Sequence, residues 1–364
     1  MSWGNPTTPF DKLRKTVLTP ASFAYFVGSL ARLEGYRVGM LKREQADVPV
    51  ISIGNITCGG TGKTPVTIDL AQKFIAAGLK VGILSRGYKR KSKERTVVVS
   101  DGAGNFADCE SAGDEPYLIA KRLPKAVVLV GSNRRASAAL AVSHYGCEIL
   151  LLDDGFQHFP IRRDLDIVLI DYNDEPKRDS LLPSGRLREP LSALSRASSL
   201  VITKIPENPD QEKIQRLEQT LREHAGDKPV DKCTFEASNL VSPNSVVLPV
   251  SAMNGNKVIA VSALARPESF VSMLTQRGAD VVKTMTFQDH HWYSAEDLDS
   301  IEAAITNGTM VITTEKDLVK MKPSEKLAER LYALRIDTKW IDSPPAVLDE
   351  YVNQVKSAVE KQKK

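Results

Sequence analysis

The residues from Gly54 to Pro65 have the types and the spacing of a loop that binds phosphate groups. They read GNITCGGTGKTP, follow the apolar run 49–53 and precede a run with helical spacing, which is the strand–loop–helix setting of a Walker A loop. In such a loop, backbone N–H groups surround the phosphates, Lys63 would reach the β- and γ-phosphates, and the Thr64 hydroxyl would bind Mg²⁺. The predicted nucleotide-binding residues are Thr57, Cys58, Gly59, Gly60, Thr61, Gly62, Lys63 and Thr64.

One position of this loop departs from the usual pattern. Thr57 occupies the place of the first glycine of GxxxxGK[ST], so Gly59 and Gly60 are expected to supply the positive φ angles that the turn needs. The alternative is an ordinary glycine-rich turn before a helix, which the intact GGTGKT stretch disfavours.

Two pairs of acidic residues stand where a metal ion or a catalytic base would be needed. Asp153 and Asp154 end an apolar run and should lie at the carboxyl edge of a sheet, where carboxylates can hold Mg²⁺ or its waters. Asp114 and Glu115, in the sequence GDEP, begin a helical stretch. Capping of that helix is an alternative role for this second pair, and it is compatible with catalysis.

Two histidines and several arginines are further candidates, although their spacing alone decides nothing. His290 and His291 lie in FQDHHWY, where an imidazole could act as a base and the aromatic rings could form a wall for a sugar; a structural role is the alternative. Arginines in loops could bind phosphate oxygens or simply be solvated. They are Arg86 in SRGY, Arg134 and Arg135, and Arg186 and Arg188 in LPSGRLREP.

These residues need a scaffold of alternating strands and helices. β-branched and apolar runs predict strands with helices between them, an alternation typical of a mostly parallel sheet covered on both faces. The expected strands are 49–54, 80–84, 96–100, 126–130, 149–153, 167–171, 200–203, 258–262, 280–286 and 310–314. The expected helices are 65–77, 116–122, 134–145, 267–277, 295–306 and one after residue 344.

From about Lys228 the pattern changes and predicts a second, smaller α/β unit. Prolines punctuate shorter runs there, and 234–237 with 245–248 suggest a ribbon that joins two domains. We therefore expect five parts: an N-terminal amphipathic helix region (1–45), a P-loop domain (46–230), a β-ribbon linker (231–250), a smaller α/β domain (251–340) and a C-terminal helix (341–364).

Composition excludes several other classes of protein. The chain has 364 residues, 42% hydrophobic and 26% charged, which fits two globular domains and not a disordered, collagen-like or coiled-coil chain. A formal net charge of +4 gives no reason to expect nucleic acid as a partner. The 4 cysteines lie far apart without a CxxC motif, so neither a zinc site nor a disulfide framework is expected.

The N-terminal segment carries an apolar stripe between basic flanks. Its uncharged run, Thr16 to Ala31, is shorter than the ~20 residues that cross a bilayer. A helix over about 21–41 could lie in the headgroup layer of an anionic membrane or pack on the protein's own core, and the pattern alone supports both. The residues of the stripe are Phe23, Phe26, Leu30 and Leu33.

Taken together, these motifs resemble the tetraacyldisaccharide 4′-kinase family of lipid A biosynthesis. GNITCGGTGKTP, SRGY, GDEP, LLDDGFQH, RDLDIVLID, LLPSGRLREP, FQDHHWY and TTEKD follow one another from about residue 20 to about residue 320. The resemblance implies transfer of the γ-phosphate of ATP to the 4′-hydroxyl of a tetraacyl disaccharide 1-phosphate, in a cleft between two α/β/α domains. It also implies docking of the N-terminal helix on the cytosolic face of the bacterial inner membrane. We further expect a monomer.

The resemblance also implies roles for individual residues. Asp114 would pair with His290 as the general base, and His291 is an alternative partner. It further implies that Thr57 in place of a glycine is a common feature of the family. The remaining matches are Arg86, which faces a phosphate, and the acids around Mg²⁺, which are Glu115, Asp153 and Asp154.

Two other functions remain as alternatives. One is a P-loop GTPase that acts as a switch or a metallochaperone, because VITK at 201–204 is similar to the guanine-reading [NT]KxD motif; Pro206, however, stands in place of its aspartate. The other is a membrane-peripheral scaffold that binds nucleotide without transferring phosphate, which the intact Lys63 and Thr64 disfavour.

Overall fold

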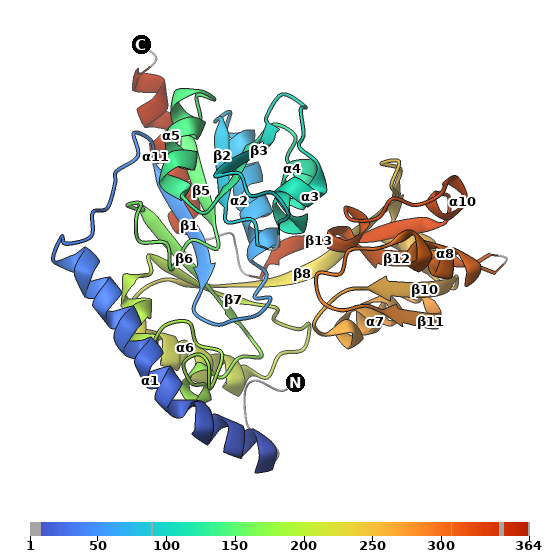
Figure 1. The fold of residues 1–364 in the computed structure, drawn as a ribbon, viewed down its shortest axis with the longest axis horizontal. Helices are drawn as coiled ribbons and strands as arrows, with labels where there is room; N and C mark the ends of the chain where they lie inside the picture. Colours follow the sequence, from blue (N-terminus) through green and yellow to red (C-terminus); the bar gives the residue numbers. More distant parts are fainter. Residues whose placement is uncertain (1–8, 89, 307, 342–345, 363–364) are drawn as a thin grey trace.

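One continuous sheet runs through both of the expected α/β units. A computed structural model describes residues 9–88, 90–306, 308–341 and 346–362, so the outer ends of the two terminal regions predicted above, 1–8 and 363–364, lie outside the described residues. In this part of the chain the sheet has 13 strands, twelve of them in the order β11-β10-β12-β13-β8-β7-β6-β1-β5-β2-β4-β3, with β9 paired to β8 (Figure 1).

The first lobe is built around β1 (Val50–Asn55), a strand whose residues are all buried. Its parallel neighbours are buried on both faces, which explains why they read as continuous apolar runs. They are β5 (Ile149–Asp153), β2 (Val81–Ser85) and β4 (Val127–Gly131) on one side, and β6 (Leu165–Asp171) and β7 (Ser199–Thr203) on the other. An antiparallel strand, β3 (Thr96–Asp101), closes the edge.

Helices cover both faces of this half, and alternate residues of β1 point to different sides. Ile51 and Ile53 pack in one core with α2 (Lys63–Ala76) and α4 (Asp114–Arg122), whereas Val50 packs in another with α5 (Arg134–Ser143). Two further helices are α3 (Cys109–Ala112), which precedes α4, and α6 (Gln211–Ala225), which packs over β6 and β7.

The second lobe repeats this arrangement on a smaller scale. Its parallel strands are β10 (Lys257–Ser262), β11 (Asp280–Thr286) and β12 (Met310–Thr314). They lie between α7 (Pro267–Gln276), which packs in one core, and α8 (Ala295–Ala303), which packs in another. Two short helices, α9 (Glu315–Leu318) and α10 (Glu325–Ala328), follow β12.

The connection between the lobes is a ribbon, but its second strand differs from the expected one. β8 (Val230–Val241) pairs in parallel with β7 of the first lobe and antiparallel with β13 (Leu331–Trp340) over most of its length. The hairpin expected within 231–250 does form with β9 (Val247–Pro249), at the far end of β8. The long partner, β13, comes from the segment assigned to the smaller domain, because a pairing between strands so distant in sequence leaves no local pattern.

The C-terminal helix, α11 (Ala346–Gln362), returns to the first lobe after β13 (Figure 1). Its Leu348 and Val355 are buried in the same core as α2. Next to it, the indole N–H of Trp340 donates to Asp69 Oδ2 at 2.9 Å. The second lobe is therefore an insertion between two segments of the first.

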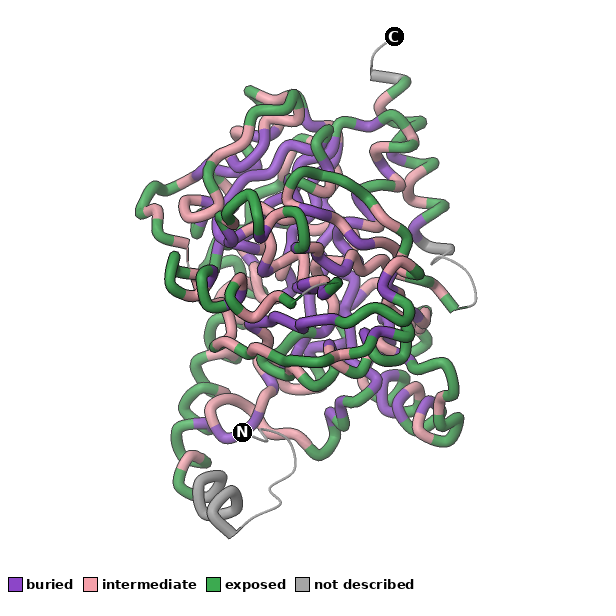
Figure 2. The backbone as a smooth tube through the Cα atoms, turned by 90° about the vertical axis from the view of Figure 1, so that its right-hand side faces the viewer, coloured by how far each residue is buried: buried purple, intermediate pink, exposed green. Residues whose placement is uncertain are grey.

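The N-terminal helix, α1 (Pro9–Arg37), lies along the outside of the first lobe with much of its surface exposed (Figures 1 and 2). The Ser22 hydroxyl fixes it to residues 180–190, at 3.1 Å from the Leu181 carbonyl and 2.8 Å from Ser184 Oγ. Of the apolar stripe, Phe23 is 66% and Leu30 37% exposed, while Phe26 and Leu33 are half-buried. None of the helices described here is long and apolar enough to cross a bilayer.

Candidate active site

The phosphate loop lies between the expected strand and helix and takes its positive φ angles at two glycines. These are Gly59, with φ 132°, and Gly62, with φ 86°. Gly60 has no positive φ, so the prediction for Gly60 is wrong; the turn into the first residue of α2, Lys63, needs that conformation at Gly62 instead. A Cβ atom at Gly62 would lie 2.0 Å from the ring of Phe235 on β8, so the linker strand packs directly against the loop.

Residues 180–190 hold the first part of the loop. Thr57 forms an antiparallel bridge with Leu187, and the N–H of Cys58 donates to the Arg186 carbonyl at 2.7 Å. The Thr57 hydroxyl donates to Asp174 Oδ2 at 3.1 Å, and Thr57 is only 2% exposed. Its side chain therefore anchors the loop to the protein, and a bound nucleotide could meet only its backbone.

Lys63 is held at the edge of the sheet by oxygen atoms of two neighbours. Its Nζ lies 3.5 Å from Asn55 Oδ1 and 3.6 Å from Asp154 Oδ1. Arg188 donates from Nη1 to both carboxylate oxygens of Asp154 at 2.9 Å. Burial alone would raise the pKa of Asp154, but Lys63 and Arg188 outweigh it and lower that pKa. Asp154 is therefore ionised beside the lysine of the loop.

Asp153, the last residue of β5, is a buried carboxyl group with a different character. Its oxygens lie 3.4 Å from the Thr67 hydroxyl and 3.3 Å from the Ser85 hydroxyl. Burial raises the pKa of Asp153 to about 6, and the nearby carboxylates of Glu115 and Asp154 add to this effect. A carboxylate that is costly to ionise for these reasons is stabilised by a nearby cation.

The residues at this edge fit a magnesium ion. Asp153 and the Thr64 hydroxyl at the start of α2 are the oxygen donors that Mg²⁺ prefers. Among the residues that the structure describes, no group of three or more His, Cys, Asp or Glu side chains is arranged to hold a metal.

The second lobe brings His290 to Asp114. Asp114 begins α4, is 4% exposed, and lies with Oδ2 2.9 Å from His290 Nδ1. His290 has φ 65°, a conformation that is uncommon outside glycine and is often found at functional sites. Burial alone would raise the pKa of Asp114, but the hydrogen bond from His290 and the Lys316 ammonium outweigh it and lower that pKa. Asp114 is therefore ionised beside His290.

His291, the alternative partner, faces the other way. Its Nε2 lies 2.8 Å from Asp297 Oδ2 at the start of α8, and its ring stacks on Phe287 with centroids 5.0 Å apart. It also meets the ring of Tyr293 edge-on. These contacts give His291 a structural place in its own loop and leave His290 as the imidazole at Asp114.

A chain of charged contacts joins the two halves of the site. Glu115, next to Asp114, is close enough to Asp153 to raise its pKa. Glu115 Oε1 also lies 3.1 Å from Lys316 Nζ, and that ammonium lies 3.2 Å from His290 Nε2. The predicted metal residues and the predicted base are thus parts of one site, although Glu115 pairs here with a lysine.

The arginines differ in what they contact. Arg134 is buried and donates to the carbonyls of Asp153 (3.1 Å) and Asp154 (3.2 Å). Arg86 follows β2 and is exposed. It lies close enough to Arg134 for its positive charge to add to the effect of burial, and both lower the pKa of Arg134. Arg186, by contrast, forms ion pairs with Asp174 and Asp179. These pairs tie residues 180–190 to the residues just before them.

Several residues of the site were not predicted from the sequence. Lys316 and Lys320 both approach Asp114, and Arg122 of α4 binds Glu315 of α9 at 2.8 Å. The signal that could have found Lys316 and Glu315 is TTEKD, which follows an apolar run as Asp153 and Asp154 do and therefore also lies at the carboxyl end of a parallel strand.

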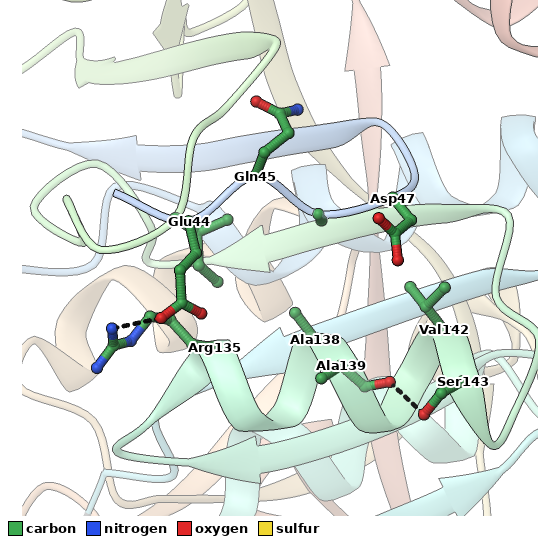
Figure 3. A pocket seen from close by; sticks show the side chains of 10 residues that line it. Glu44, Gln45, Asp47, Arg135, Ala138, Ala139, Val142 and Ser143 are labelled. Atoms are coloured by element: carbon green, nitrogen blue, oxygen red, sulfur yellow. Dashed lines mark hydrogen bonds and ion pairs between the residues drawn. The ribbon is translucent and has the colours of Figure 1, made fainter. Parts of the chain in front are cut away.

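A second depression in the surface is separate from this site. It is lined by residues 44–47 and by one side of α5, and Figure 3 shows the ion pair between Glu44 and Arg135 at its edge, 2.6 Å long. Arg135, one of the candidate phosphate-binding arginines, therefore lies here and not beside the phosphate loop, and Asp114, His290, Arg86 and the predicted nucleotide- and metal-binding residues do not line this depression.

The fold and the site together define the class: this is a P-loop enzyme of the NTPase-like α/β type, with the groups needed to move a phosphate. A family model described as tetraacyldisaccharide-1-P 4′-kinase matches residues 14–355, and the chain belongs to this family, LpxK. The resemblance drawn from the motifs and the expected α/β fold are both confirmed.

Similar proteins support the same assignment over almost the whole chain. A tetraacyldisaccharide 4′-kinase of Anaeromyxobacter sp. (strain Fw109-5) is 38% identical over 340 residues, which are 93% of this chain and 91% of the relative. One of Halothermothrix orenii is 39% identical over 331 residues, covering 86% of this chain and 85% of the relative. The crystal structure of LpxK from Aquifex aeolicus, described as an "apo" form in complex with ATP, is 34% identical with a TM-score of 0.76 and covers 94% of this chain and 99% of its own.

Proposed function

We propose that this protein is an ATP-dependent tetraacyldisaccharide 4′-kinase of lipid A biosynthesis, which transfers the γ-phosphate of ATP to the 4′-hydroxyl of tetraacyldisaccharide 1-phosphate. The observation that carries the proposal is the contact between Asp114 and His290, whose Oδ2 and Nδ1 atoms are 2.9 Å apart. Glu115, the next residue, is close enough to Asp153 to raise its pKa, so this pair lies near the acids at the phosphate loop. Family membership supports the substrate. It also disfavours the GTPase alternative, in which Lys204 would have to read a guanine; here Lys204 pairs with Asp171 at 2.7 Å.

The chain's own residues account for the steps of this reaction. The backbone N–H groups of the loop and Lys63 hold the phosphates. Arg86 and Arg134 would help to balance the negative charge of the transferred phosphoryl group. As the bond between the sugar O4′ and the γ-phosphorus forms, the bond from that phosphorus to the β-phosphate oxygen breaks and ADP leaves with the electron pair. The proton of the 4′-hydroxyl passes to Asp114, which His290 orients.

We also propose Mg²⁺ as the cofactor, held by Asp153 and the Thr64 hydroxyl, with Asp154 and Glu115 beside it. When bound, Mg²⁺ supplies positive charge at the phosphates. The raised pKa of Asp153 supports the proposal, since a cation relieves the cost of ionising that group. Asp154 is paired with Lys63 and Arg188, so its part would be to orient the lysine and water rather than to bind the metal alone.

The enzyme is proposed to act at the cytoplasmic face of the bacterial inner membrane, through α1. The support is the exposed apolar surface of that helix, on which Val17, Phe23 and Val27 are 67%, 66% and 48% exposed. A lipid acceptor that keeps its acyl chains in a bilayer needs the active site near that surface. Both sides of the site come from one chain, which supports a monomer.

The function is tested by transfer of radiolabelled γ-phosphate from ATP to tetraacyldisaccharide 1-phosphate in detergent micelles, with Lys63→Ala as the control. We expect a labelled lipid bisphosphate with the wild-type protein and almost none with the variant. GTP in place of ATP should give much less product. ATP binding without any labelled lipid would point instead to the scaffold alternative and contradict the proposal.

A further inference from the structure

Lys316, a residue of TTEKD that the proposed mechanism leaves without a role, lies at the centre of the contacts between the lobes. It belongs to the short helix α9 and is 20% exposed. Its Nζ lies 3.1 Å from Glu115 Oε1, 3.2 Å from His290 Nε2 and 3.9 Å from Asp114 Oδ2. One ammonium group therefore touches both members of the catalytic pair and the acid next to them.

The contact with His290 constrains where the imidazole carries its proton. A lysine ammonium has three donors and no acceptor, so the Nε2 atom that faces it must accept and carries no hydrogen. The hydrogen is then on Nδ1, which donates to Asp114 Oδ2 at 2.9 Å. A doubly protonated ring would place an N–H group and a positive charge directly against the ammonium.

Lys316 itself remains charged in this position. Burial acts to lower the pKa of its ammonium, but the carboxylates of Glu115 and Asp114 outweigh that effect and leave the pKa raised. The second lysine of the region, Lys320, lies 3.8 Å from Asp114 and is fully buried against Asp317 at 2.9 Å. Lys316 is thus the ammonium that reaches the ring.

We propose that Lys316 is a positioning residue that holds the His290 imidazole in the tautomer that donates from Nδ1 to Asp114, and so keeps the carboxylate oriented towards the acceptor. This inference rests on the proposed kinase function. The other groups that face His290 are the ring of Tyr88, 5.6 Å from it, the neighbouring Asp289, and Lys320 through Asp114. Unlike these groups, Lys316 places a donor at His290 Nε2.

The test compares Lys316→Met, which keeps the length of the side chain but removes the charge, with Lys316→Arg, which keeps a cationic donor. For Lys316→Met we expect kcat to fall roughly tenfold or more while KM for ATP stays close to the wild-type value. Lys316→Arg should bring kcat back towards the wild-type value, because it again places a cationic donor at Nε2.

A second readout follows the tautomer directly and needs no acceptor. In protein labelled with ¹⁵N-histidine, His290 should show a protonated Nδ1 and a bare Nε2; His290→Gln identifies its signals. Lys316→Met should convert part of that signal to the other tautomer. Lys326→Met, at an exposed lysine that pairs with Glu302, is the matched control and should change neither readout.

Unchanged ¹⁵N signals in Lys316→Met would overturn the inference, even if kcat falls, because the lysine would then supply only charge or packing. Failure of the proposed function looks different. In that case the wild-type protein gives no labelled lipid at all, while the histidine signals still report whether Lys316 sets the tautomer.

Discussion

At the scale of single residues, the site places unusual backbone conformations at residues that make its central polar contacts. Asp154 and His290 are two of the few non-glycine residues with positive φ in the described chain, at 52° and 65°. Both sit where a side chain must be aimed at a partner, Asp154 at Lys63 and His290 at Asp114. Such strain persists only where surrounding contacts over-determine it.

Asp114→Asn tests the proposed base with almost no change in shape. The amide cannot accept the proton of the acceptor as a carboxylate does, so we expect kcat to fall about 100-fold or more, while ATP binding is retained because the phosphate loop is untouched. Phosphate transfer and equilibrium ATP binding are measured on the same preparation. Turnover near the wild-type level would remove Asp114 from this role.

Asp153→Asn should stabilise the ligand-free protein at neutral pH while it removes the Mg²⁺-dependent activity. The pKa of Asp153 is raised to about 6 in the fold, so the folded state holds this proton more tightly than the unfolded chain does. Stability is therefore lost as pH rises from about 4 to 6, by roughly 3 kcal/mol for a shift of this size, and Asn avoids that loss.

The measurement is chemical unfolding of both proteins at pH 5 and pH 8, without nucleotide or metal. The gain from Asn should be clear at pH 8 and smaller at pH 5, where the wild-type group is largely protonated. Equal gains at both values would show that burial of the charge is not its cause.

At the scale of elements, α4 and α9 form the main polar contact between the lobes. Arg122 of α4 binds Glu315 of α9 at 2.8 Å and also pairs with Asp337 of β13. Glu315 is held in addition by Arg335 at 3.2 Å. Because Lys316 is the next residue, the same helix that fixes the lobes together also places the ammonium at His290.

Arg122→Met should lower the free energy of unfolding by about 2–3 kcal/mol, since it leaves the largely buried Glu315 with one partner fewer. In a Glu315→Gln background the same change should cost clearly less, because no buried charge is then stranded. Urea unfolding of the four proteins of this cycle gives both values. An equal cost in the two backgrounds would mean that the ion pair does not couple these helices.

Most elements were predictable because each leaves a local pattern. The ten strands expected from apolar runs and the five helices expected between residues 65 and 306 all appear, with boundaries that differ by a few residues at most. The N-terminal helix expected over about 21–41 instead begins at Pro9 and ends at Arg37. α6 and β13 were not among the expectations. The partner of β8 is set by contacts across the whole second lobe, and the ion pairs of Lys316 and Arg122 depend on that same long-range pairing, so no local window of sequence contains them.

At the scale of the whole molecule, α1 and the active site lie against the same segment. Residues 180–190 receive Ser22 and the Tyr25 hydroxyl, which donates to the Arg188 carbonyl at 2.9 Å, and Arg188 in turn pairs with Asp154. The surface proposed to meet a bilayer is therefore only a few contacts away from the phosphate loop.

Replacing Phe23 and Val27 of α1 with Glu should lower binding to vesicles that contain anionic lipid by at least about tenfold, because two exposed apolar side chains no longer enter the headgroup layer. Co-sedimentation with the vesicles measures the bound fraction. Ala24→Ser, on the same exposed part of the helix, is the matched control. Unchanged binding of the double variant would argue against α1 as the membrane surface.

The return of α11 to the first lobe has a consequence for how the protein is made. Leu348 and Val355 fill the same interior as Phe74 on α2, yet the ribosome synthesises them only after every residue of the second lobe. The nucleotide-binding half therefore cannot finish its interior while the chain is still growing. A chain truncated shortly before residue 346 would keep all of its catalytic groups but would expose the apolar surface that α11 covers. Such a chain should be readily degraded by proteases.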